Sequence, residues 1–122
     1  MKYALLIYAT PGASEGADPP GEGVIDSWVD YTVAMKESGS LLAAEQLAPV
    51  DTATSVTMRS GERLLTDGPF IETKEHLLGF YLLDVPDLDT ALDWAAKMPI
   101  MKYGTVEVRP VLEGQAWRAP LE

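Results

Sequence analysis

The sequence predicts an α+β fold, a ferredoxin-like sandwich in which two helices cover one face of a four-stranded antiparallel sheet and a β-hairpin is inserted. Strand-like and helix-like segments follow one another in the order β-α-β, hairpin, β-α-β. Two of the strand-like segments are apolar on both of their faces. The 122 residues contain no repeat and no linker-like tract, so we expect a single domain over residues 1–122.

The first half of the chain supplies a strand, a helix and a second strand. Lys2–Ala9 is apolar on both alternating faces, which is typical of a strand buried on both sides. This run is too short for a signal peptide or a membrane span. Residues 10–23 are rich in glycine and proline and predict a loop. The predicted helix then begins near Val24 and ends at Gly39, and the second strand covers Ser40–Glu45. The apolar residues at helical spacing are Val24, Trp28, Tyr31 and Met35.

The second half repeats this pattern after a hairpin. Thr54–Arg59 and Arg63–Thr66 are predicted to pair across a turn at residues 60–62. The later elements are a strand at Leu77–Val85, a helix capped by Asp87 and stopped by Pro99, and a strand at Thr105–Val111. In the last strand, alternation places Val106 and Val108 towards the helices, and Thr105, Glu107 and Arg109 on the other face.

Composition excludes several classes of function. With 19 acidic and 9 basic residues the formal net charge is −10, which disfavours binding to nucleic acids and to anionic membranes. The absence of cysteine rules out thiol catalysis, disulfides and zinc–thiolate sites, and is compatible with a cytoplasmic protein. We find no metal-binding spacing of His, Asp and Glu and no phosphate-binding glycine loop, so we expect neither a metal nor a cofactor.

The apolar pattern also predicts a partner. In a monomer with both helices on one side, the second face of the sheet would be bare. Strands that are apolar on both faces would then expose more apolar surface than soluble monomers normally do. A homodimer in which the two sheets face each other resolves this problem.

Several separated motifs resemble one family. They are Met1-Lys2-Tyr3, Gly39, Asp67-Gly68-Pro69-Phe70 with Glu72, Lys74 and Glu75, Gly79-Phe80-Tyr81-Leu82, Pro86-Asp87, Gly104, and Val106-Glu107-Val108-Arg109-Pro110. In this order they resemble the YCII-related family, in the bacterial subgroup marked by the DGPF motif. The resemblance implies a dimeric α+β barrel. It also implies a regulatory setting, because genes of this subgroup often neighbour those for extracytoplasmic-function sigma factors.

Some members of the broader family have a proposed histidine–aspartate dyad, with lyase-type chemistry in at least some of them. This chain departs from that pattern. Its only histidine, His76, lies beside the charged DGPF loop, whereas Trp28 and Tyr31 occupy the first helix. No catalytic role is carried over on that basis. Trp28, Tyr31 and Trp94 are interpreted as packing between helix and sheet.

The DGPF loop has two interpretations. In the structural one, Asp67 and Gly68 form a tight turn, Pro69 fixes its exit and Phe70 anchors the loop in the core. In the functional one, the turn presents Asp67, Glu72 and Lys74 at the mouth of a pocket. Glu72, Lys74 and Glu75 are by default solvated charges.

Three further residues are candidates for a site. Glu107 and Arg109 lie two apart on the predicted open face of the sheet, where a charge needs a partner. Either they form a salt bridge, within the chain or across the dimer, or Arg109 binds a ligand carboxylate that Glu107 orients or deprotonates. His76 is an acid–base candidate, although an exposed histidine at a strand edge is the simpler interpretation.

Two functions therefore stay open. The favoured one is binding of a small molecule in a regulatory or accessory role, which needs only a pocket between the sheet and the helices. A carboxylated ligand is one option, and the candidate ligand-binding residues are Arg109, Lys74 and Glu107. The alternative is a cofactor-independent lyase or isomerase acting on a small cyclic or carboxylated substrate. That alternative requires a displaced pKa at a buried carboxylate or at the histidine. The candidates for this group are Asp67, Glu72, His76 and Glu107.

Overall fold

The computed structural model describes residues 1–13, 23–70 and 73–113. Its strands are β1 (Lys2–Ala9), β2 (Leu41–Gln46), β3 (Thr54–Arg59), β4 (Glu62–Asp67), β5 (His76–Asp84) and β6 (Gly104–Pro110). Its α-helices are α1 (Trp28–Glu37) and α2 (Leu88–Lys97), and short 3₁₀ turns occupy Val50–Thr52 and Pro99–Lys102. The predicted α+β architecture is confirmed, and every predicted strand and helix is present.

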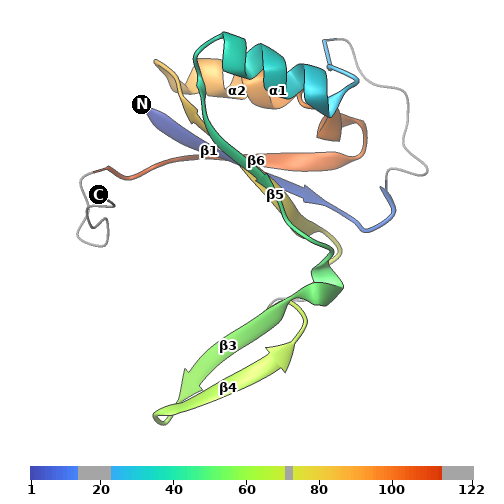
Figure 1. The fold of residues 1–122 in the computed structure, drawn as a ribbon, viewed down its shortest axis with the longest axis vertical. Helices are drawn as coiled ribbons and strands as arrows, with labels where there is room; N and C mark the ends of the chain where they lie inside the picture. The colour runs from blue at the N-terminus through green and yellow to red at the C-terminus, as the bar shows by residue number, and fades with distance from the viewer. Residues whose placement is uncertain (14–22, 71–72, 114–122) are drawn as a thin grey trace.

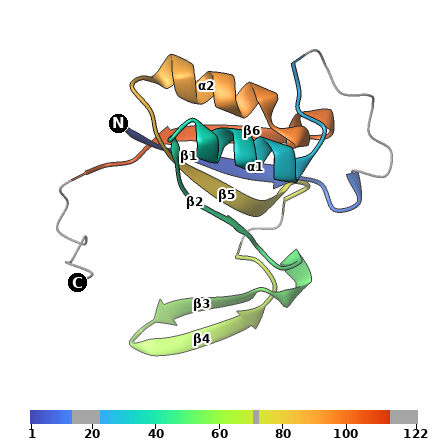
Figure 2. The ribbon, with the colours of Figure 1, turned by 45° about the horizontal axis from the view of Figure 1, so that its top comes forward.

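Four strands form one antiparallel sheet in the order β2-β5-β1-β6, and both helices lie on the same face of it (Figures 1 and 2). This is the strand order of a ferredoxin-like fold. On β1, Tyr3, Leu5, Ile7 and Ala9 are buried, whereas the residues between them are only half-buried. The alternation follows from the two-residue period of a strand. The core therefore lies between the sheet and the helices.

Helix α1 begins four residues later than its apolar periodicity predicted. Ser27 is the N-cap, and its hydroxyl accepts a hydrogen bond from the Asp30 N–H at 3.2 Å. The preceding segment is held outside the helix, because the Ile25 N–H donates to the Lys97 carbonyl at 2.8 Å and Asp26 forms a 2.8 Å ion pair with Lys102. These two contacts fasten the start of α1 to the end of α2 and to the turn that follows it.

The predicted hairpin is present as a separate two-stranded sheet that projects away from the four-stranded sheet (Figures 1 and 2). Its turn is tighter than predicted, because Ser60 and Gly61 alone connect the strands, both with positive φ. Hairpin residues Val56 and Leu65 are paired and each 60% exposed. An isolated hairpin is only marginally stable in water, so these side chains leave apolar area uncovered.

The DGPF motif forms a turn at the base of this hairpin. The Gly68 N–H donates to the Ala53 carbonyl at 2.7 Å, and the Gly68 carbonyl accepts from the Ser55 hydroxyl at 2.8 Å. Gly68 has φ +97°, a conformation that favours glycine. The expectation that Phe70 anchors the loop in the core is wrong: its side chain is 79% exposed, because it lies next to the projecting hairpin and not against the helices.

The face of the sheet opposite the helices carries the second apolar set that the sequence predicted. Cross-strand register places Leu6 beside Phe80, and Ala4 beside Leu82. We call this the open face; its large apolar residues Leu6, Phe80 and Leu82 are half-buried in the single chain. Within the residues described, no helix is long and apolar enough to cross a membrane.

Candidate functional site

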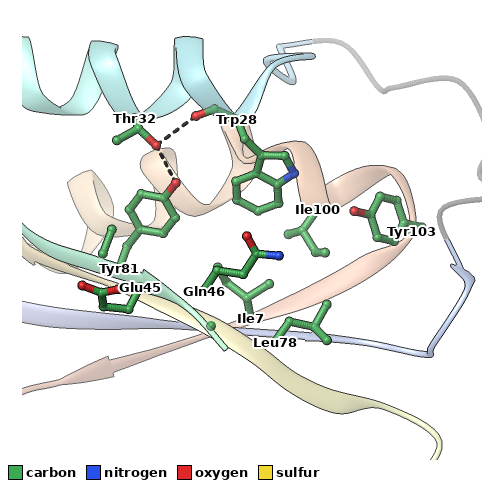
Figure 3. Close-up of a pocket in the computed structure, with 11 residues that line it drawn as sticks. Ile7, Trp28, Thr32, Glu45, Gln46, Leu78, Tyr81, Ile100 and Tyr103 are labelled. Carbon is green, nitrogen blue, oxygen red and sulfur yellow. Dashed lines mark hydrogen bonds between the residues drawn. The ribbon is translucent and has the colours of Figure 1, made fainter. Parts of the chain in front are cut away.

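A pocket of about 440 Å³ lies between helix α1, the helix-covered face of the sheet and the 3₁₀ turn after α2 (Figure 3). Helix α1 contributes Trp28 and Thr32, and the turn region contributes Ile100 and Tyr103. The sheet contributes Ile7, Leu78, Gly79 and Tyr81 from its centre, and residues 44–46 from the edge strand β2. The lining is mainly apolar and aromatic with a few polar groups, which is typical of small-molecule sites.

Two irregularities in the sheet shape this pocket. Ile7 pairs with Gly79 and Tyr8 pairs with Leu77, so Leu78 is an extra residue in a β-bulge. Leu78 is half-buried and contributes to the lining beside Ile7. Gly79 permits a close approach of β2, because a Cβ built there would lie 2.5 Å from the Glu45 carbonyl oxygen. The end of β2 thereby comes close enough to form one wall.

An aromatic cluster forms the opposite wall. The Trp28 and Tyr81 rings are nearly parallel, with centroids 6.3 Å apart and an interplanar angle of 12°. Tyr31 packs edge-on against Trp28, Tyr81 and Trp94 and is completely buried. Edge-on and offset arrangements of this kind are the favourable geometries for aromatic pairs. Burial, followed by repulsion from the neighbouring Tyr81, raises the pKa of the Tyr31 hydroxyl far above its usual range. Tyr31 is therefore a neutral structural residue.

The hydroxyl groups at the pocket form a short chain. Thr32 Oγ1 donates to the Trp28 carbonyl at 2.9 Å and lies 2.6 Å from the Tyr81 hydroxyl oxygen (Figure 3). A threonine hydroxyl has a single hydrogen. With that hydrogen directed to the Trp28 carbonyl, we assign the Tyr81 hydroxyl as the donor in the pair with Thr32. The Tyr81 oxygen then keeps lone pairs that can accept a further hydrogen bond.

Gln46 provides a carboxamide on the wall formed by β2. Its side chain rises from β2 into the space beneath the Trp28 ring (Figure 3). Glu45 is the one charged residue among the described residues that line the pocket. Its strand partner is Phe80, which belongs to the open face, so alternation directs the Glu45 side chain away from the helices. The surfaces that face the pocket from the helix side of the sheet are uncharged.

The predicted residues Glu107 and Arg109 lie on the open face, on the side of the sheet away from this pocket. Register places Glu107 beside Leu6 and Arg109 beside Ala4, and both side chains are exposed in the single chain. The Tyr8 hydroxyl donates to Glu107 Oε1 at 3.4 Å. Within the described part of the chain, Arg109 has no ion-pair partner, so the predicted intrachain salt bridge between them is absent.

The other candidates lie near the junction of the hairpin and β5. His76 is half-buried at the first position of β5, opposite Ala9, and Glu75 accepts a 3.5 Å hydrogen bond from Thr105. Asp67 and Lys74 are exposed, and Glu72 lies outside the described residues. None of Asp67, Lys74 and His76 lines the pocket. The structure therefore places Glu107 and Arg109 on one face of the sheet, and Glu75 reaches Thr105 of the same strand.

In the described ranges, no three His, Asp or Glu side chains gather closely enough to hold a metal ion. The pocket offers aromatic faces, one carboxamide and hydroxyl groups. Such groups can bind and orient an organic molecule through stacking and hydrogen bonds.

Comparison with known proteins agrees with the fold. The family model for the YCII-related domain matches residues 1–115. The chain is also 44% identical over 114 residues to an uncharacterised protein from Rhizobium meliloti (strain 1021). The aligned region covers 91% of this chain and 92% of that protein. The architecture and these matches define a single class of protein. The chain belongs to the YCII-related family.

Sequence reasoning missed most of the pocket residues. Thr32, Gln46 and Tyr103 belong to no motif that predicts a site, and Trp28 was interpreted as packing between helix and sheet. Gly79 was the one available signal, because a glycine inside a long apolar strand indicates a close backbone approach or a bulge. That signal indicates where another strand approaches, but it does not identify the residues that the other strand brings.

Proposed function

We propose that this YCII-related protein binds a small organic molecule in the pocket between helix α1 and the sheet, in a regulatory or accessory role. The observation that carries the proposal is the pocket itself. Its volume of about 440 Å³ falls within the range of small-molecule sites, and its walls combine aromatic faces with a few hydrogen-bonding groups. Such a site needs no cofactor to bind its ligand.

A thermal-shift screen against a broad set of metabolites tests this proposal. A ligand at a hundredfold its dissociation constant adds about 2.7 kcal/mol of stability, which gives a clear rise in melting temperature. Trp28→Ala removes the aromatic face that lines the pocket and is expected to abolish the shift. Trp94→Ala is the matched control, because Trp94 belongs to the same aromatic cluster but does not line the pocket. Hits that survive Trp28→Ala in a folded protein would contradict the proposal.

The alternative of a lyase or isomerase has less support. Among the described candidates, neither Asp67, His76 nor Glu107 lines the pocket, and Glu107 lies on the opposite face of the sheet. A bound molecule in the pocket would therefore meet none of these acid–base groups. Following each hit by NMR in the presence of the protein distinguishes the two functions, because a ligand remains unchanged over time whereas a substrate is consumed.

We also propose that two copies of the chain pair through their open faces. Leu6, Phe80 and Leu82 form a continuous apolar surface there, and pairing would remove it from water. Glu107 and Arg109 lie on the same face, so two antiparallel copies would place opposite charges against each other. The exposed hairpin residues Val56 and Leu65 would add area to such an interface.

The carboxylated ligand that the sequence offered as one option would bind at this same face and not in the pocket. Arg109 is its binding group in that proposal, with Glu107 beside it, whereas Lys74 is in the exposed segment before β5. The variant Arg109→Ala separates the two roles. Loss of a carboxylate-dependent thermal shift would indicate a ligand site, and weaker self-association without any ligand would indicate an ion pair between copies.

A further inference from the structure

We propose that the ligand of the helix–sheet pocket is an uncharged, planar ring compound that carries an N–H or O–H donor on its edge. This inference rests on the proposed function and specifies the chemical class that the pocket takes. It follows from three properties of the pocket walls: the direction of their hydrogen bonds, their lack of positive charge and the spacing of their aromatic rings.

The hydrogen-bond direction is fixed by Thr32. Its only hydrogen is directed to the Trp28 carbonyl at 2.9 Å, which assigns the Tyr81 hydroxyl as the donor of the 2.6 Å hydrogen bond between the two side chains. Tyr81 therefore has no hydrogen left to donate, and its oxygen meets a ligand as an acceptor. A ligand group with an N–H or O–H gives that oxygen a second hydrogen bond. A ligand group with only lone pairs cannot do so and would face the lone pairs of the oxygen, which is unfavourable.

The charge of the walls excludes an anion. No Lys or Arg occurs among the described residues that line the pocket, and the chain as a whole carries a formal net charge of −10. A carboxylate would lose its hydration there without gaining a cation, and the field of the protein would oppose its approach. The Gln46 amide offers both a donor and an acceptor, which suits a neutral polar edge.

The spacing of the rings determines how a planar compound fits. A ring held between two others needs a separation of about 7 Å, twice the optimal carbon contact of ~3.5 Å. The Trp28 and Tyr81 centroids are 6.3 Å apart, so a third ring does not enter between them. The ligand instead lies against one face of Trp28, with Ile7 and Ile100 contributing apolar contacts.

Four indole derivatives test the inference on the intact protein. Indole and 1-methylindole share a ring system, but only indole can donate a hydrogen bond from nitrogen. Indole-3-carboxamide and indole-3-carboxylate have similar size, but only the second is an anion. Binding is followed through the indole N–H signal of Trp28 in the ¹⁵N-labelled protein, assigned by its loss in Trp28→Phe. Indole should bind about three- to tenfold more tightly than 1-methylindole, the effect of one neutral hydrogen bond, and the carboxamide more tightly than the carboxylate.

Two variants test whether the preference for indole over 1-methylindole depends on the Tyr81 hydroxyl. Tyr81→Phe removes the accepting hydroxyl and should abolish the preference for indole over 1-methylindole, while both compounds still bind. Thr32→Val removes the acceptor of the Tyr81 hydrogen but leaves the Tyr81 oxygen able to accept from the ligand, so the preference should persist in this variant. A purely structural role of Tyr81 would instead weaken both compounds equally in Tyr81→Phe.

Each contrary result has a definite meaning. Equal binding of indole and 1-methylindole, or tighter binding of the carboxylate, overturns the ligand class but leaves the pocket as a binding site. If none of the four compounds shifts the Trp28 signal, the ligand class is also wrong. The metabolite screen then tests the proposed function. Hits of another chemical class that are lost in Trp28→Ala would support binding in the pocket, and the absence of any such hit would contradict it.

Discussion

The hydroxyl of Tyr31 donates a hydrogen bond of 2.8 Å to the main-chain carbonyl of Trp94, and so joins α1 to α2 within the aromatic cluster. Tyr31 is completely buried and contacts the rings of Trp28 and Tyr81, which line the pocket. The bond therefore holds the two helices in the alignment that positions one wall of the pocket.

Tyr31→Phe should destabilise the protein by about 0.5–1.5 kcal/mol, the net contribution of one neutral hydrogen bond, without changing the fold. Urea unfolding followed by circular dichroism measures the change. Tyr8→Phe is the control, because the Tyr8 hydroxyl makes only an exposed 3.4 Å contact with Glu107 and its loss should be close to neutral. An equal loss of unfolding free energy in both variants would mean that the buried hydrogen bond of Tyr31 stabilises the protein no more than the exposed contact of Tyr8.

The same residue predicts a loss of stability at alkaline pH. The pKa of Tyr31 is raised in the folded state, mainly by burial, above the ordinary value of 10.0. A group of this kind contributes stability that is fully present below its unfolded pKa and is lost as pH rises through the folded one. Stability should therefore fall above about pH 10, and Tyr31→Phe should reduce that slope. Identical slopes in the two proteins would contradict this assignment.

Charged substitutions at two neighbouring residues should have different outcomes. Leu5 is completely buried under the helices, so Leu5→Lys is expected to prevent folding. Leu6 lies on the open face, so Leu6→Lys should leave a folded chain that no longer self-associates. Circular dichroism reports folding, and size-exclusion chromatography with light scattering reports mass. If Leu6→Lys has the same mass as the parent protein and that mass is a dimer's, the open face is not the interface.

Gly79→Ala should destabilise the protein by about 1–3 kcal/mol, the usual cost of overpacking. The added Cβ would meet the Glu45 carbonyl at 2.5 Å and the Gln46 Cα at 3.2 Å, so β2 must move away from β5. Since residues 44–46 form one wall of the pocket, ligand binding should weaken as well. Ala43→Ser, on the exposed side of β2, is the control. A melting temperature equal to the parent's would show that β2 accommodates the methyl group.

The N-cap of α2 predicts a change at acidic pH. The Asp87 carboxylate accepts hydrogen bonds from the hydroxyl and the N–H of Thr90, which lower its pKa. A lowered pKa gives stability that is present above the ordinary carboxyl value and is lost as pH falls through the folded one. Asp87→Asn keeps an acceptor without the titration, so its stability should depend less on acidic pH. Thermal melts from pH 7 to pH 2 compare the two proteins.

The order of elements was predictable because each follows from local rules. Asp87 was recognised as a cap from residue type alone, and alternation correctly placed Val106 and Glu107 on opposite faces of β6. The start of α1 was not predictable, because a hydrogen bond from Ile25 to Lys97, distant in sequence, holds the preceding segment out of the helix. Phe70 was misplaced because its sequence does not reveal that the hairpin projects from the body of the protein.

The residues that line the pocket were beyond prediction for the same reason. The walls of the pocket come from α1, three strands and the turn after α2, and the chain gives no local sign that Trp28 and Gln46 approach each other. Charged residues at strand spacing predicted a site at Glu107 and Arg109. The pocket instead uses aromatic and amide groups, which resemble ordinary core and strand residues until the fold brings them together.

The most direct measurement is an NMR experiment that detects contacts between a bound molecule and the methyl groups of the protein. The strongest hit of the metabolite screen is mixed with protein carrying labelled Leu and Ile methyl groups, and intermolecular nuclear Overhauser effects are recorded. A ligand in the pocket should give contacts to Ile100 and Leu78, which line it, and none to Leu82 on the open face. Contacts to Leu82 with none to Ile100 would place the ligand on the other side of the sheet and contradict the proposed site.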